Sequence, residues 1–271
     1  VATAEQMFSG ADFAYVREAA WQAAQTSGFV AIVGESGAGK TTVLEDLESR
    51  LEEEGQRIVI FKPSVVGMEE NDTKGKTLKS ADVLHAIVAQ LAPDQPIPPT
   101  VQARTLRAKK LLAASAGMGN SHLLVVEEAH TMPSATMKHL KRLHELREGR
   151  RTLLGILLLA QPELKSRFMA GMLDGSLREV AQRCEVVELL PLDGDIKPYL
   201  QTRAQAANID LARLVSDDGI DALRSRLTTK SGGKTISLAY PLAVNNLMVR
   251  ALNAAAAIGA PVVDEDIVKA A

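Results

Sequence analysis

The stretch Gly34-Glu35-Ser36-Gly37-Ala38-Gly39-Lys40-Thr41 lies between an apolar run, residues 29–33, and a helical pattern over residues 40–54. Glycines at these positions let the backbone wrap closely around phosphate oxygens, and the following helix N-terminus adds partial positive charge. Lys40 can reach the β- and γ-phosphates, and the Thr41 hydroxyl can bind Mg²⁺. The stretch therefore predicts a strand, a phosphate-binding loop and a helix. The residues expected to hold Mg·ATP are Gly34, Glu35, Ser36, Gly37, Ala38, Gly39, Lys40, Thr41 and Thr42.

Further short apolar runs alternate with helical patterns along the chain. Near-continuous apolar runs suit strands that are covered on both faces, so this alternation predicts an α/β fold with a parallel sheet. The runs cover residues 57–61, 123–126, 152–159 and 184–189, and the helical patterns between them cover residues 81–91, 101–116 and 133–147.

The pattern changes near residue 192, beyond which helical patterns follow one another without a comparable apolar run. They cover residues 195–207, 216–227 and 241–258, and residues 228–235 are predicted to form a loop. We therefore expect two domains, an α/β base over residues 1–192 and a small all-helical domain over residues 193–271.

Composition narrows the function classes. The 271 residues are 46% hydrophobic and 24% charged, which excludes a wholly disordered chain. The net charge of −2 excludes a globally basic protein, and an aromatic content of 3% argues against base stacking as the main activity. The single cysteine, Cys184, cannot form an intrachain disulfide, and no apolar run approaches the roughly 20 residues that span a bilayer. These features predict a cytoplasmic protein without a membrane partner.

Polar residues follow two of the apolar runs. Residues 123–126 lead into Glu127 and Glu128, where the first acid would hold the Mg²⁺ shell and the second would orient and activate the attacking water. Glu127 carries one methylene more than the usual aspartate, which can shift the metal geometry. Slow ATP hydrolysis is therefore an alternative to efficient turnover. Gln161 follows the run over residues 152–159 and is a candidate sensor of the γ-phosphate, or the turn that starts a helix at Pro162.

Taken together, these motifs resemble the AAA+ ATPases, and within them the ExeA/MuB/TnsC-like family. The resemblance extends from about residue 8 to the end and is strongest to the MuB-type ATPases of phage DNA transposition. It rests on the glycine-rich stretch, Glu127-Glu128-Ala129-His130, Ala160-Gln161-Pro162-Glu163-Leu164 and Tyr240-Pro241-Leu242-Ala243-Val244-Asn245-Asn246-Leu247. It implies a P-loop base domain, a helical lid, and assembly into rings or helical filaments.

The resemblance also implies an arginine that reaches the γ-phosphate of the neighbouring subunit. Arg183 is closest to that position and Arg178 is the other candidate, whereas a solvated basic surface is the ordinary alternative for both. The lid of the family usually carries a second sensor arginine in a Gly-x-Pro-Arg motif. Leu242 stands at that place here, so this contact with the nucleotide is expected to be missing.

Transposition-type members wrap around double-stranded DNA, which implies contacts after the second strand and at the start of the next helices. Such contacts to phosphates would be independent of DNA sequence. The alternative is a solvated polar loop, and acidic residues at positions 69, 70 and 72 weaken the case for DNA. The candidates are Lys74, Lys76, Thr77, Lys79 and Arg104.

We therefore expect an ATPase that binds double-stranded DNA with ATP, forms homo-oligomers on it and regulates a transposase. Glu128, Gln161 and Arg183 would be catalytic, and Thr41 and Glu127 would hold the metal. One alternative is a secretion or assembly ATPase module of the ExeA type. The other is a nucleotide-binding scaffold that hydrolyses weakly, which Glu127 and Leu242 motivate.

Overall fold

The computed structural model describes residue 8, residues 10–63 and residues 78–271. The chain falls into two compact units. The first, here called the sheet unit, comprises Val16–Val33 and Val43–Glu188. The second, called the helical unit, gathers the described residues up to Tyr15 with Gly34–Thr42 and Leu189–Ala271. A single division at residue 192 stays a prediction, because these units describe compactness and not independent folding.

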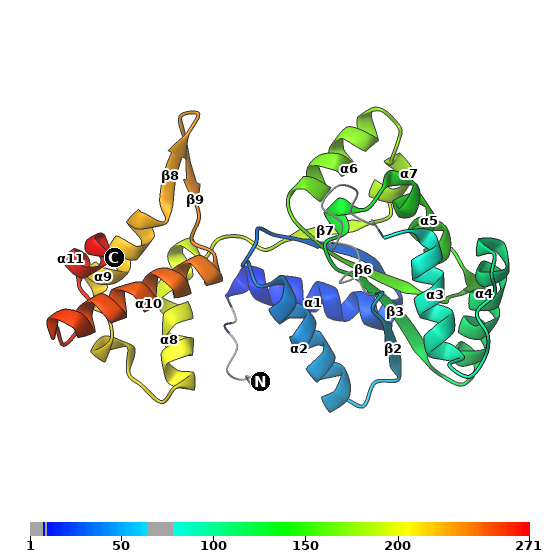
Figure 1. Cartoon of the computed structure of the whole chain (residues 1–271), viewed down its shortest axis with the longest axis horizontal. Coiled ribbons are helices and arrows are strands. Elements are labelled where there is room, and N and C mark those ends of the chain that lie inside the picture. The colour runs from blue at the N-terminus through cyan, green and yellow to red at the C-terminus, as the bar shows by residue number, and fades with distance from the viewer. Residues whose placement is uncertain (1–7, 9, 64–77) are drawn as a thin grey trace. The chain divides into compact units, whose positions relative to one another are not determined.

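Five parallel strands form the sheet in the order β2-β3-β6-β1-β7 (Figure 1). The central strand β6 lies between β3 and β1, and Val33 at the end of β1 pairs with Ala160 at the end of β6. Their bounds are β1 Phe29–Val33, β2 Ile58–Phe61, β3 Ser121–Val126, β6 Gly155–Ala160 and β7 Glu185–Glu188. This topology confirms the predicted α/β fold with a parallel sheet.

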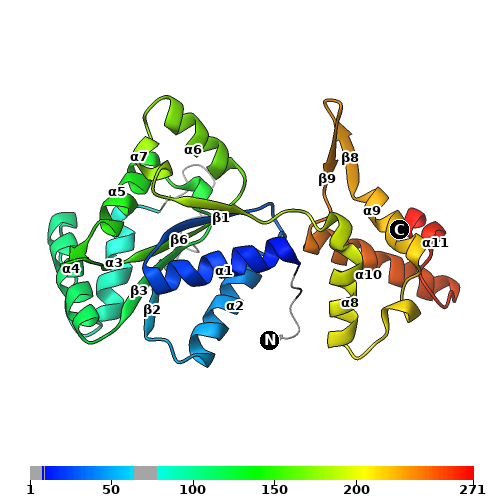
Figure 2. The same ribbon diagram turned by 180° about the vertical axis from the view of Figure 1, so that it is seen from behind.

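Helices cover both faces of this sheet (Figures 1 and 2). Alternate strand residues such as Phe29, Ala31 and Leu158 join one buried cluster with the helices α3, α4 and α5. Their neighbours Ile32 and Leu157 point to the opposite face and are also fully buried. The helices of this unit are α1 Ala11–Thr26, α2 Lys40–Glu53, α3 Ser80–Leu91, α4 Val101–Gly117, α5 Ser134–His144, α6 Glu163–Leu173 and α7 Arg178–Ala181, the first two beginning in the helical unit.

Two arginine contacts join α1 to α2 within the sheet unit. Arg17 donates two hydrogen bonds of 2.6 Å to the buried carboxylate of Asp46, a bidentate geometry that favours a fixed orientation. The Arg50 guanidinium lies 3.8 Å from the centroid of the Trp21 ring, within the range of a cation–π contact. These contacts hold the helix that follows the glycine-rich stretch against the helix that precedes β1.

The helical unit is built around a second apolar cluster. Tyr199, Leu223, Leu247 and Val268 are buried in it, and each comes from a different helix. The helices are α8 Ile196–Ala206, α9 Asp217–Arg226, α10 Pro241–Ile258 and α11 Glu265–Ala270, with short turns η3 Asp193–Asp195 and η4 Leu211–Arg213.

Local sequence signals start three of these helices. The Ser216 hydroxyl accepts a hydrogen bond from the Gly219 N–H at the start of α9, and the Asp264 carboxylate accepts one from the Ile267 N–H at the start of α11. The first residue of α10 is Pro241, which suits a first turn because its missing N–H would have no partner there.

Two hairpins differ from the sequence predictions. Residues 228–235, predicted as a loop, include β8 Thr228–Ser231, which pairs with β9 Lys234–Ser237. The turn between them holds Gly232 and Gly233 at positive φ, as a tight hairpin turn requires. These strands are mostly polar, so they lack the apolar signal on which the prediction relied, and the unit is not all-helical.

The second hairpin pairs β4 Arg147–Glu148 with β5 Arg151–Thr152 around Gly149. Helix α5 ends at His144 and not at the predicted residue 147, and the hairpin follows it. The next strand of the sheet therefore begins at Gly155 and not at the predicted residue 152.

Among the helices of the described residues, none is both long enough and apolar enough to cross a membrane.

Candidate nucleotide-binding and catalytic site

The glycine-rich stretch forms a tight loop that leads directly into α2. Gly37 and Gly39 have φ values of 76° and 104°, a region that L side chains rarely adopt. The Ala38 N–H donates a hydrogen bond of 3.1 Å to the Glu35 carbonyl, which closes the turn. Because α2 begins at Lys40, the N–H groups of its first turn, which lack intrahelical partners, lie directly after this loop. The loop therefore has the backbone conformation of an anion-binding cradle.

Lys40 lies over the same loop. Its ammonium group donates hydrogen bonds to the carbonyl oxygens of Gly34, at 2.6 Å, and Glu35, at 2.9 Å. Thr41 and Thr42 follow on the first turn of α2 and are exposed. This donor set suits a triphosphate, since a lysine, the N–H groups at a helix start and a threonine hydroxyl come from consecutive residues.

Leu242 contacts the loop from the start of α10. Its N–H donates a hydrogen bond of 3.2 Å to the Gly37 carbonyl. A Cβ at Gly37 would lie 2.4 Å from the Cβ of Leu242, so only glycine fits at this point. The leucine thus occupies space beside the loop and brings no charge to it.

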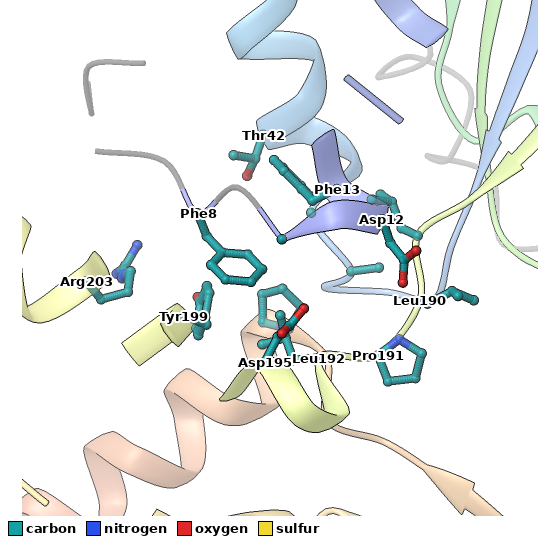
Figure 3. A pocket seen from close by; sticks show the side chains of 15 residues that line it. Phe8, Asp12, Phe13, Thr42, Leu190, Pro191, Leu192, Asp195, Tyr199 and Arg203 are labelled. Carbon is teal, nitrogen blue, oxygen red and sulfur yellow. The ribbon is translucent and has the colours of Figure 1, made fainter. Parts of the chain in front are cut away.

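A pocket within the helical unit opens beside the loop (Figure 3). Its volume is about 150 Å³, below the roughly 300 Å³ of a pocket that encloses a whole drug-sized ligand. Phe8 and Tyr199 meet edge to face there, with ring centroids 5.6 Å apart. Its size and aromatic lining suit the base or ribose end of a nucleotide whose phosphates lie on the loop. The lining includes Phe8, Phe13, Ala38, Thr42, Tyr199 and Arg203.

This pocket was not predicted from the sequence. Its walls come from the N-terminal residues, the glycine-rich loop and the segment after β7, which are far apart in the sequence. Single aromatic residues such as Phe8 and Tyr199 carry no spacing signal, so only the fold brings them together.

The sheet unit brings Glu128 and Gln161 together. The Gln161 side-chain nitrogen lies 3.5 Å from Oε2 of Glu128, at the carboxyl ends of β6 and β3. Glu128 has a φ of 48°, an uncommon backbone conformation for a glutamate. Such backbone strain is found at functional sites, and here it accompanies a half-exposed carboxylate.

His130 completes this cluster, a role that was not predicted from the sequence. Its Nδ1 accepts a hydrogen bond of 3.4 Å from the Gln161 backbone, and its Nε2 lies 3.6 Å from Oε2 of Glu128. Arg167 in turn donates to the carbonyl oxygens of His130 and Met132 and so supports the turn after β3. The order Glu-Glu-Ala-His alone does not reveal that the imidazole bridges two strand ends.

Glu127 is exposed directly after β3. Within the described part of the chain, no three His, Cys, Asp or Glu side chains gather closely enough to hold a metal ion by themselves. That is compatible with Mg²⁺, which commonly takes one or two carboxylates together with phosphate oxygens and water. Thr41 and Glu127 are therefore donors of the type that this ion would use.

Arg183 lies just before β7 and is exposed. Its Nη2 atom lies 2.9 Å from Oε1 of Glu145. The other candidate, Arg178, donates to the Met172 carbonyl at 3.3 Å and begins α7. The structure thus places both arginines on the surface of the sheet unit.

The candidates for DNA contact have different environments. Lys74, Lys76 and Thr77 lie outside the described residues. Lys79 is exposed at the start of α3, whereas the Arg104 guanidinium donates to the Pro98 carbonyl at 2.7 Å and to the Ala81 carbonyl at 3.4 Å. A DNA contact by Arg104 stays a prediction, and it would require these carbonyl partners to be exchanged for phosphate.

Comparison with known proteins identifies a sequence relative. The chain is 30% identical over 184 residues to general secretion pathway protein A of Aeromonas hydrophila, across 66% of this chain and 30% of that protein. The chain therefore spans less than a third of that relative's length.

Solved structures share the fold. The ORC2 protein of Aeropyrum pernix, in its ADPNP–ADP complexes, has a TM-score of 0.59 at 17% identity, across 94% of this chain and 66% of that one. The RuvB Holliday junction branch migration motor of Thermotoga maritima has a TM-score of 0.51 at 17% identity, across 95% and 65%. At these identities the likeness shows the fold alone.

Residues 23–168 match the family described as AAA domain. They include β1, the glycine-rich loop, the acidic turn after β3 and the Gln161 turn after β6. Because this match extends over more than half of the chain and contains these elements, the protein belongs to the AAA domain family.

Proposed function

We propose that this chain is an ATP-hydrolysing AAA domain that binds double-stranded DNA in its ATP-bound state and oligomerises on it. The observation that carries the ATPase part is the pairing of Glu128 with Gln161 at the carboxyl edge of the sheet. Val33, the last residue of β1, pairs with Ala160, the last residue of β6, at that edge.

Each residue has a role in this proposal. Lys40 and the loop N–H groups would hold the phosphates. Thr41 and Glu127 would hold Mg²⁺, which would stabilise the negative charge that develops on the leaving ADP. Glu128 would orient the attacking water, and Gln161 would sense the γ-phosphate. His130 would keep the Glu128 carboxylate facing Gln161. Arg183 would act on the nucleotide of a neighbouring subunit.

Turnover measurements test the catalytic assignment. We expect Glu128→Gln to bind ATP as the wild type does and to lose phosphate release, because an amide cannot accept a proton from water. Lys40→Ala should lose ATP binding itself. Equal turnover for the wild type and Glu128→Gln would remove Glu128 from catalysis and favour a scaffold that hydrolyses weakly.

The DNA part of the proposal is supported by the exposed Lys79 at the start of α3 and by the fold shared with a Holliday junction motor. A more specific version of this proposal is that the chain regulates a transposase, and it rests on the resemblance of the motifs. Fluorescence anisotropy with a random-sequence duplex should show binding with ATP and little with ADP. Raising the salt concentration should weaken that binding, since phosphate contacts release counterions.

A matched pair of variants locates the DNA contact. Lys79→Glu should weaken DNA binding, whereas Lys230→Glu, which changes another exposed lysine, on β8, should not. If both variants bind as the wild type does, Lys79 has no part in the contact.

The 30% identity to general secretion pathway protein A favours a second candidate, a secretion or assembly ATPase module. That candidate predicts ATP binding and turnover with no DNA binding in any nucleotide state. The anisotropy experiment therefore separates the two functions.

A further inference from the structure

Four side chains form a continuous series of ion pairs on the surface of the sheet unit. Arg183 Nη2 lies 2.9 Å from Glu145 Oε1, and the Lys141 ammonium lies 3.1 Å from that same oxygen. Lys141 also reaches Oε2 of Glu179 at 2.8 Å. Oε1 of Glu145 is thus shared by Arg183 and Lys141, and Lys141 also pairs with a second acid, Glu179.

The local fold explains why these residues meet. Lys141 and Glu145 are four residues apart at the end of α5, so their side chains lie on one face. Glu179 lies in α7, which packs against α5, and Arg183 follows α7 before β7. The hydrogen bond that Lys141 donates to Glu179 lowers the pKa of this carboxyl, so the acid stays charged beside the ammonium group.

We propose that Glu145 is a positioning residue that holds Arg183 away from a neighbouring subunit's nucleotide, and that Lys141 weakens this hold. The inference rests on the proposed role of Arg183 in trans. Two cations compete for one oxygen of Glu145. When Arg183 moves to bind a phosphate, the Glu145 carboxylate stays paired with Lys141. The move therefore leaves no unpaired carboxylate behind.

The solvent exposure of the Arg183–Glu145 ion pair sets how strongly Glu145 holds Arg183. The side chains of Arg183 and Glu145 are 44% and 38% exposed, so water screens the pair. Exposed ion pairs shift an equilibrium by a factor of about two to five. That is enough to change subunit association without preventing it.

Two single substitutions should shift association in opposite directions. Glu145→Gln frees Arg183, so the protein concentration for half-maximal association should fall about two- to fivefold. In Lys141→Met, Arg183 has no competitor for Glu145 and is held more strongly. The protein concentration for half-maximal association should therefore rise by a similar factor. We would measure association by sedimentation with a non-hydrolysable ATP analogue, and turnover against protein concentration. At saturating protein, turnover should equal that of the wild type.

The controls separate this device from a structural role. Glu265→Gln removes a comparable Glu–Lys pair on α11 and should change nothing. In an Arg183→Ala background both shifts should vanish. A purely structural role would move Glu145→Gln and Lys141→Met in the same direction, and it would persist without Arg183; either result overturns the inference.

Failure of the proposed function looks different. If Arg183→Ala associates and turns over as the wild type does, Arg183 has no role in trans, and the role of Glu145 falls with it. The ATPase assignment itself rests on Glu128 and falls only if Glu128→Gln turns over as the wild type does. If Arg183→Ala loses turnover while Glu145→Gln and Lys141→Met match the wild type, only the role of Glu145 is refuted.

Discussion

The N–H of Leu242 donates a hydrogen bond of 3.2 Å to the carbonyl oxygen of Gly37, so the first turn of α10 rests on the glycine-rich loop. The resemblance places a sensor arginine where this chain has Leu242. The contact that joins α10 to the loop is therefore made by backbone and apolar atoms, and it does not depend on a charged side chain.

This contact makes Gly37 a position with two constraints. Gly37→Ala should weaken ATP binding by at least about tenfold, because the added Cβ meets Leu242 at 2.4 Å and the φ of 76° costs an L residue about 1–2 kcal/mol. Isothermal calorimetry with ATP measures the loss. Gly232→Ala is the control, since Gly232 has a φ of 56° and nothing within 4 Å of an added Cβ. Equal ATP affinity in the two variants would show that the loop tolerates a side chain.

Tyr199 allows the pocket to be tested separately from stability. Tyr199→Phe loses only the hydroxyl that accepts a hydrogen bond of 2.8 Å from Asn245, so the free energy of unfolding should fall by about 1 kcal/mol and nucleotide affinity should hold. Tyr199→Ala also loses the ring against Phe8, and we expect about 3 kcal/mol of lost stability and weaker nucleotide binding. Chemical denaturation and ADP titration measure both quantities. Weaker binding in Tyr199→Phe would instead assign the hydroxyl to the nucleotide.

From one buried and two half-buried histidines, we predict that the free energy of unfolding decreases in acid. Burial lowers the pKa of His122, His139 and His144 below the ordinary 6.5. The unfolded chain therefore binds more protons at these histidines than the folded chain does near pH 6.5 and below. The contribution of these histidines to the free energy of unfolding should be constant above about pH 7.5 and become more destabilising as the pH decreases. Each histidine can contribute up to about 1.4 kcal/mol per pH unit.

His122→Gln tests that slope. His122 lies between the Leu153 carbonyl and the Ser115 hydroxyl, at 3.0 and 2.9 Å, and glutamine removes the titrating group there. The free energy of unfolding from denaturant titrations should fall less steeply with pH in the variant. Parallel curves would show that His122 does not titrate on unfolding.

The sequence was sufficient for elements with a strong apolar pattern. The strand at residues 29–33 and the helix at residues 241–258 have the predicted bounds. Burial on both faces leaves a continuous apolar run, and burial along one stripe of a helix leaves a helical periodicity. The polar hairpin of β8 and β9 lacks that signal and was missed.

The candidate site shows the same division. Residues of the glycine-rich loop are consecutive, so their spacing indicates phosphate binding directly. The contacts of Glu128 with His130 and of Arg183 with Glu145 depend on how strand ends and helices are placed. Spacing along the chain carries no information about such contacts, and the left-handed backbone of Glu128 leaves no mark in the sequence.

The aromatic residues have an optical consequence. Trp21, beneath Arg50, is the only tryptophan and belongs to the sheet unit, whereas all three tyrosines, Tyr15, Tyr199 and Tyr240, belong to the helical unit. Tryptophan emission therefore reports on one unit and tyrosine absorbance on the other, without any label. Melting curves that coincide at both signals would indicate one cooperative transition, and curves that separate would indicate two.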